Sequence, residues 1–93
     1  MPRWLQSGLR RDLCVCLLAG PQRSGAIKTA LERRYDGRIR PKTFHGALEA
    51  LVDSGHLERR VDGVQERYAL TDAGRAAVED HYEWVERQLA TDE

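Results

Sequence analysis

The sequence is poor in the features that mark several large classes of protein. It has two cysteines, one methionine and one phenylalanine in 93 residues. Cys14 and Cys16 are too close for an unstrained disulfide, which argues against a disulfide-rich secreted domain and favours a reducing cytoplasm. No apolar run approaches the roughly 20 residues that span a bilayer. We therefore expect a cytoplasmic protein without a membrane partner.

Motifs of catalysis and of metal binding are missing as well. The chain has no glycine-rich phosphate loop and no nucleophile paired with a base. His45, His56 and His81 fall in separate expected elements, and Cys14 and Cys16 point to different sides of one helix, so no zinc site is indicated. Buried structural thiols are the preferred interpretation of the cysteines. We expect no enzymatic activity, no metal and no cofactor.

The chain also lacks net charge, but its charges are segregated. Fifteen basic and fifteen acidic side chains cancel. Residues 1–60 hold twelve basic against six acidic side chains, whereas residues 61–93 hold three against nine. A basic body followed by an acidic tail is a mild indication of an anionic partner for the body. The length allows one domain with a core and excludes a multidomain enzyme.

Three helices are expected within the first 55 residues. The first has an apolar stripe at helical spacing, formed by Leu9, Leu13, Cys16 and Leu17. Val15 and Leu18 make its other side apolar, so we expect a central helix buried on most sides that ends at Gly20-Pro21. The expected second helix has Ser24 as N-cap and ends at Asp36-Gly37. Its predicted face comprises Ile27, Ala30, Leu31 and Arg34 or Tyr35.

The third helix is predicted to begin at Pro41 and to end at Gly55. Its core stripe is formed by Phe44, Leu48, Leu51 and Val52. The period then changes to two, which predicts a hairpin. Either Asp62-Gly63 forms its turn and Arg59 faces Glu66, or Gly63-Val64 forms it and Arg60 faces Arg67. In both registers Arg60, Gln65 and Arg67 share one side, opposite the apolar residues.

A last helix should follow Thr71, which is expected to be its N-cap. The predicted order of three helices, a two-stranded hairpin and a final helix is that of a winged helix-turn-helix, mostly α with a small β-hairpin. We expect residues 1–71 to form this domain with an N-terminal extension, and residues 72–93 to form a dimerisation helix.

Three segments, Thr43–Leu51, Gly55–Glu58 and Tyr68–Arg75, carry a resemblance to a known family. They read TFHGALEAL, GHLE and YALTDAGR, and together they resemble the PadR-like winged-helix transcription regulators, in particular the short haloarchaeal and phage-repressor-like members. The resemblance covers most of the chain. It implies a winged-helix fold and DNA binding.

In a helix-turn-helix, the N-terminal residues of the recognition helix enter the major groove. The outer face of the third predicted helix carries donors near its start and carboxylates, Glu49 and Asp53, near its end. The predicted DNA-binding residues are Ser24, Arg38, Arg40, Lys42, Thr43, His45, Gly46, Arg60, Gln65 and Arg67. The alternative is that the helix face is merely solvated, that Gly46 packs on a neighbouring helix, and that Arg60 and Arg67 pair with Glu58 or with solvent.

Large apolar residues at the two chain ends predict a homodimer. The expected interface residues are Trp4, Leu5, Val78, Tyr82, Val85 and Leu89. The alternative is that Trp4 packs on Trp84 within one chain. The function that these features favour is a sequence-specific transcriptional regulator, a repressor, that binds double-stranded DNA at a palindromic operator. The competing prediction is a winged-helix module for protein interaction, and no inducer can be inferred.

Overall fold

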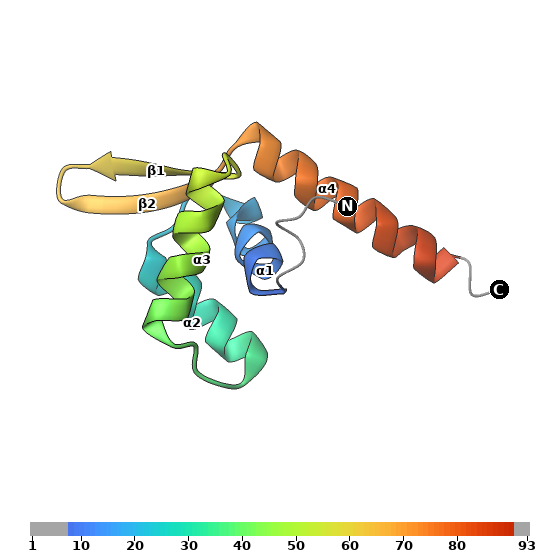
Figure 1. The fold of residues 1–93 in the computed structure, drawn as a ribbon, viewed down its shortest axis with the longest axis horizontal. Coiled ribbons are helices and arrows are strands. Elements are labelled where there is room, and N and C mark those ends of the chain that lie inside the picture. Colours follow the sequence, from blue (N-terminus) through green and yellow to red (C-terminus); the bar gives the residue numbers. More distant parts are fainter. Residues whose placement is uncertain (1–7, 91–93) are drawn as a thin grey trace.

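The computed structural model describes residues 8–90, and Figure 1 shows a helical body from which a hairpin and a long helix project on opposite sides. The elements in chain order are α1 (Gly8–Cys16), the short 3-10 helix η2 (Leu17–Ala19), α2 (Ser24–Tyr35), α3 (Pro41–Asp53), β1 (Leu57–Asp62), β2 (Gln65–Leu70) and α4 (Asp72–Ala90). The strands form a two-stranded antiparallel sheet. This order confirms the predicted winged helix-turn-helix.

One core joins these elements. Its largest side chains are fully buried and come from every helix of the body and from β1: Phe44, Leu13, Leu17, Ile27, Leu31, Leu48, Leu51 and Leu57. Tyr68 from β2 and Val78 from α4 belong to the same cluster, together with the smaller side chains of Cys14, Ala47 and Ala77. Because α4 contributes only Gly74, Ala77 and Val78 as buried residues, the rest of this helix extends beyond the core. Within residues 8–90, no helix has the length and apolar character to cross a membrane.

The first helix is less buried than the sequence predicts. Leu13, Cys14 and Leu17 have 2% or less of their surface exposed, but Val15 is 44% and Leu18 is 38% exposed. The expectation of a helix buried on most sides is therefore wrong. Val15 and Leu18 are exposed because α4 packs on the body only through its first turns and then diverges from it (Figure 1).

The second helix begins one residue earlier in its hydrogen-bond ladder than predicted. Arg23 is the N-cap, with extended backbone and no capping side chain, and Ile27 N–H donates to its carbonyl at 3.1 Å. Ser24 is the first helical residue, so its prediction as N-cap is wrong. The predicted end is confirmed, because Asp36 has a left-handed backbone with φ of 54°. Ile27 and Leu31 are buried as expected, whereas the other predicted face residues are exposed: Ala30, Arg34 and Tyr35.

The third helix follows the prediction closely. Pro41 occupies its first turn, and Phe44, Leu48 and Leu51 are buried. The helix ends in a Schellman turn, in which Gly55 has φ of 81° and His56 N–H donates to Leu51 O at 2.9 Å.

The hairpin takes the second of the two predicted registers. Arg60 faces Arg67 and Asp62 faces Gln65, so Gly63-Val64 forms the turn. The base of the hairpin is tied to the segment before α2 by paired hydrogen bonds of 3.0 and 2.8 Å between the backbones of Gln22 and Tyr68. This bridge fixes the wing relative to the helical body.

Candidate functional site

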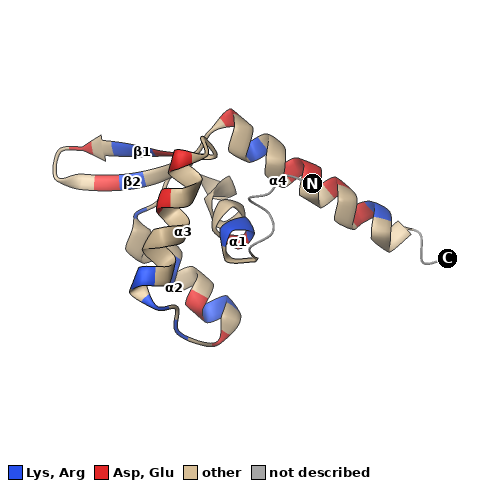
Figure 2. Ribbon diagram, in the orientation of Figure 1, with Lys and Arg blue, Asp and Glu red and all other residues tan. Residues whose placement is uncertain are grey.

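The outer face of α3 presents hydrogen-bond donors over a buried apolar stripe. Lys42, Thr43, His45 and Gly46 are all exposed, while Phe44 between them is buried. The His45 ring packs edge-on against Phe44, with ring centroids 5.8 Å apart. Figure 2 shows basic residues at the start of α3 and acidic residues toward its end. The structure therefore brings the predicted donors together at the N-terminal end, where the helix dipole also favours an anion.

Gly46 has open space beside it in the described part of the chain. A Cβ added at this position would meet no atom within 4 Å. The alternative interpretation, in which Gly46 packs on a neighbouring helix, is therefore wrong for the described chain. The glycine leaves the middle of the exposed α3 face without a side chain, which permits a close approach to the backbone from outside.

The turn before α3 is held by a residue that the sequence did not single out. The Glu32 carboxylate accepts the Ile39 N–H at 2.8 Å and lies 3.6 Å from Lys28 Nζ. The Ile39 N–H, aided by the charges of Lys28 and Arg38, lowers the pKa of Glu32. This bond fixes the segment in which Arg38 and Arg40 are exposed. The spacing of Lys28 and Glu32 predicts their ion pair, but no sequence signal marks the bond to Ile39.

Arg60 and Arg67 share the outer face of the wing but differ in their partners. Arg60 pairs with Glu58, with Nη2 and Oε1 2.7 Å apart. Among residues 8–90, Arg67 forms no ion pair. The predicted common face is thus confirmed. The alternative of pairing to Glu58 therefore holds for Arg60 and not for Arg67, whose guanidinium has no partner among the described residues.

Two further positions frame this surface. Arg23 and the half-buried Ser24 follow directly after Gln22, so they lie at the base of the wing. The exposed Arg23 was missed by the sequence interpretation, which assigned the capping position to Ser24. Gln65 is half-buried and lies opposite Asp62 near the wing tip. Arg38 and Arg40 lie beyond the far end of α2, so the predicted set spans the body from that turn to the wing.

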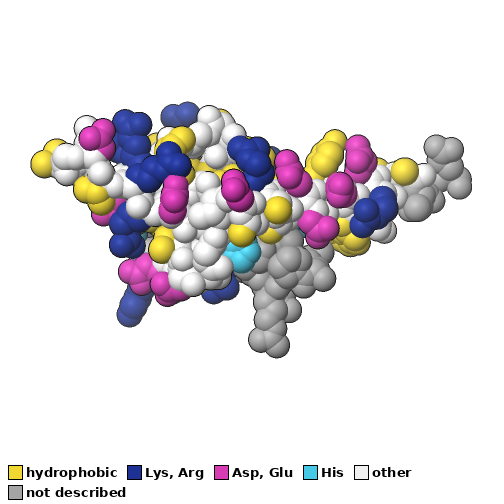
Figure 3. Space-filling view, turned by 90° about the horizontal axis from the view of Figure 1, so that it is seen from above, with side chains coloured by type: hydrophobic (Ala, Val, Ile, Leu, Met, Phe, Trp, Pro, Cys, Tyr) yellow, Lys and Arg dark blue, Asp and Glu magenta, His cyan; other side chains and the backbone are white. Residues whose placement is uncertain are grey.

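The long helix α4 has a surface that differs from those of α3 and the wing. α4 carries five acidic and two basic residues, and Figure 3 shows acidic side chains along this helix. Val78 is buried, Val85 is half-buried, and Tyr82 and Leu89 are 62% and 70% exposed. The predicted apolar stripe of α4 is thus present but largely uncovered. Trp4 and Leu5, which were expected to join it, lie outside the described residues.

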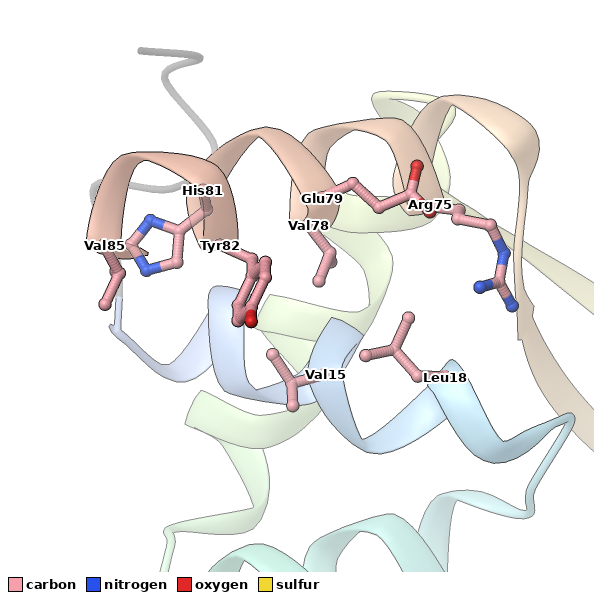
Figure 4. Close-up of a pocket in the computed structure, with 8 residues that line it drawn as sticks. All are labelled: Val15, Leu18, Arg75, Val78, Glu79, His81, Tyr82 and Val85. Carbon is pink, nitrogen blue, oxygen red and sulfur yellow. The ribbon is translucent and has the colours of Figure 1, made fainter. Parts of the chain in front are cut away.

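An apolar groove of about 470 Å³ lies between α4 and the continuous segment formed by α1 and η2. Figure 4 shows Val15 and Leu18 on one wall, with Val78 and Tyr82 directed toward them from α4. Arg75, Glu79, His81 and Val85 complete its lining. Nδ1 of His81 is buried and has no hydrogen-bond partner within residues 8–90. The His81 ring lies beside Trp84, with centroids 5.9 Å apart.

The two thiols differ in burial. Cys14 is fully buried, and burial raises its pKa to about 12. Cys16 is half-buried, and burial and the Asp12 charge raise its pKa. The predicted burial of structural thiols thus holds fully for Cys14 and partly for Cys16. Within residues 8–90, no three metal-ligating side chains cluster.

No protein-family model matches this chain, and no curated protein matches it. Solved structures do resemble it. RosR of H. salinarum is 27% identical with a TM-score of 0.86, over 94% of this chain and 80% of RosR. The reduced form of the B. subtilis transcriptional regulator YodB is 22% identical with a TM-score of 0.81, over 97% of this chain and 86% of YodB.

B. subtilis PadR, solved in complex with operator DNA, is 19% identical with a TM-score of 0.67. The match covers 82% of this chain and 47% of PadR. The predicted resemblance to PadR-like winged-helix transcription regulators is confirmed at the level of the fold.

Proposed function

We propose that this protein is a sequence-specific DNA-binding transcriptional regulator. The observation that carries the proposal is the exposed N-terminal half of α3, where Lys42, Thr43 and His45 present donors beside the open Gly46. Side chains of this kind read base edges and phosphates in the major groove. The solved complex of PadR with operator DNA supports this use of the fold.

The arginines around α3 are proposed to contact the phosphate backbone. Arg38 and Arg40 precede the helix, Arg67 lies on the wing without an ion-pair partner in the described part of the chain, and Arg60 exchanges its Glu58 partner for phosphate. Ser24 and Gln65 supply weaker polar contacts at the wing base and tip. Such contacts fix the register of the protein on DNA without specifying sequence.

The regulator is further proposed to act in the cytoplasm as a homodimer on a palindromic operator, with residues 1–71 reading DNA and residues 72–93 dimerising. The exposed apolar stripe of α4 and the groove beside Val15 and Leu18 support this, because a second copy of α4 would cover both. A twofold dimer places two recognition helices about 34 Å apart, one turn of DNA. Repression is the proposed output, since a dimer on an operator blocks access to it.

A second candidate function is a protein-interaction module, which the same apolar groove and the acidic arm favour. Salt distinguishes the two. Phosphate contacts predict that binding falls with log salt at a slope of about −0.9 for each neutralised phosphate, whereas apolar docking is nearly insensitive.

The proposal is tested by anisotropy measurements on the purified protein with duplex DNA from upstream of its own gene and with an unrelated duplex. Preferential, salt-sensitive binding is expected. Equal and weak binding to both duplexes would contradict sequence-specific regulation, and the absence of binding at low salt would favour the interaction module.

A further inference from the structure

The start of α4 is joined to the end of α3 by a set of hydrogen bonds centred on Thr71. The Thr71 hydroxyl donates to Gly55 O at 2.6 Å and accepts the Gly74 N–H at 3.1 Å. The Thr71 backbone N–H donates to His56 O at 3.2 Å. One residue therefore caps α4 and, at the same time, grips two successive carbonyl groups of another element.

Those two carbonyls belong to the turn that terminates the recognition helix. Gly55 N–H donates to Val52 O at 3.0 Å, and His56 N–H donates to Leu51 O at 2.9 Å. The peptide groups of Gly55 and His56 thus end α3 through their N–H groups and hold α4 through their oxygens. The link between the helices thus combines the Thr71 hydroxyl with backbone N–H and carbonyl groups.

Gly74 allows the first turn of α4 to approach the end of α3 closely. It is buried, and a Cβ at this position would lie 2.1 Å from His56 O and 3.0 Å from Leu70 Cδ2. Any side chain here would push the first turn of α4 away from the end of α3. The glycines of α2 and of the middle of α3 differ, because a Cβ at Gly25 or Gly46 meets nothing within 4 Å.

A small change of angle at the junction displaces the far end of α4, because most of this helix extends beyond the core. Ala77 and Val78 are the last buried residues of α4, and the helix continues to Ala90. These twelve further residues span about 18 Å at 1.5 Å per residue, so a tilt of about 10° at the junction moves the far end by about 3 Å. When α4 carries the dimer contact, that tilt becomes a displacement of one recognition helix relative to the other.

We propose that Thr71 and Gly74 are positioning residues that fix the angle between α3 and α4 and thereby set the half-site spacing that the dimer recognises. The inference rests on the proposed function. It adds that the spacing depends on the junction between α3 and α4, outside the residues proposed to contact DNA.

The test is selection of binding sites from a library of duplexes with a randomised centre, applied to the full chain. Wild-type protein is expected to select inverted half-sites at one spacing. Thr71→Val keeps the shape but removes the hydroxyl, and it should retain the half-site sequence while the preference for that spacing falls about tenfold, as expected for two lost hydrogen bonds. Thr71→Ser restores the hydroxyl and should restore the spacing.

Gly74→Ala is a second variant, with Gly25→Ala as its matched control, since both add one methyl to a helix and only the first collides with backbone. Gly74→Ala should shift or broaden the selected spacing, and Gly25→Ala should not. Thermal unfolding and light scattering establish that the selected variants are folded dimers.

An unchanged single spacing in folded, dimeric Thr71→Val protein would overturn the inference and leave the proposed function standing. Failure of the wild type to select inverted half-sites would overturn the proposed function together with the inference. Loss of the half-site sequence itself in Thr71→Val would show that the junction shapes the reading face, and it would also overturn the spacing role.

Discussion

The two exposed arms of this molecule differ in chemistry although both project from one core. The α3 face and the wing offer hydrogen-bond donors and arginines interspersed with carboxylates, and the wing also exposes Val61 and Val64. α4 offers an apolar stripe between carboxylates, with Tyr82 and Leu89 largely uncovered. Donors suit an anionic partner, and an apolar stripe suits a protein surface. The two surfaces thus suit partners of different chemistry.

Reversing the charges of Lys42 on α3 and Arg67 on the wing should have the largest effect on DNA binding. The double variant Lys42→Glu with Arg67→Glu should weaken operator binding about a hundredfold, because each lost contact is worth about 1–2 kcal/mol. Anisotropy titration measures the loss, and light scattering should show an unchanged oligomeric state. Arg87→Glu reverses an exposed charge on α4 and should change binding less than about twofold. Equal losses in both variants would mean that net charge, not this surface, governs binding.

A charge placed in the apolar stripe of α4 should weaken the proposed dimer. Tyr82→Glu is expected to raise the dimer dissociation constant about thirtyfold, since a buried aromatic anchor contributes about 2 kcal/mol to an interface. Sedimentation equilibrium measures this change, and the weaker dimer should also bind the operator less tightly. Glu83→Ala, an exposed position outside the groove, is the control. A fully dimeric Tyr82→Glu protein would contradict the assignment of this surface.

On the outer face of the wing, Arg60 is already paired with Glu58. Glu58→Gln removes the carboxylate that holds Arg60 and should tighten DNA binding about threefold, within the usual 0.2–1 kcal/mol for an exposed ion pair. Glu66→Gln is the matched control, since Glu66 pairs with Arg59 on the opposite face of the hairpin. Anisotropy should show a gain for the first variant only. A loss of affinity in Glu58→Gln would mean that the ion pair itself orients Arg60 for DNA.

The smallest effect concerns the thiols of the body. Burial raises the pKa of Cys14 to about 12, above its ordinary 9.0. The folded state therefore holds this proton more tightly than the unfolded state, so the free energy of unfolding is unaffected below pH 9 and falls as the pH rises above it. Urea titrations across this range test the sign. Iodoacetamide at pH 8 should modify Cys14 only after unfolding, and rapid modification of the folded protein would contradict its burial.

The sequence predicted those features that depend on local patterns. The stripe of Phe44, Leu48 and Leu51, the turn at Gly55 and the cap at Thr71 each arise from residues within a few positions of one another. The close packing of Gly74 on His56 was not predictable, because the contact is made with the backbone oxygen of a distant residue and residue types do not indicate such contacts.

The errors have similar causes. Ser24 is a good capping residue, but the α2 ladder starts from the Arg23 carbonyl, and the cap is displaced by one position. Val15 and Leu18 are apolar, yet periodicity reports which side chains share a face and not whether another element covers it. The two wing registers were equally compatible with the apolar pattern, and only the backbone pairing distinguishes them.

The most direct test of the account is anisotropy of the wild-type protein with duplex DNA from upstream of its own gene, at two salt concentrations, with the stoichiometry measured at saturation. The account predicts preferential binding over an unrelated duplex, two protomers per site, and a steep loss of affinity at the higher salt. Binding that is equal on both duplexes, or that does not change with salt, would contradict it.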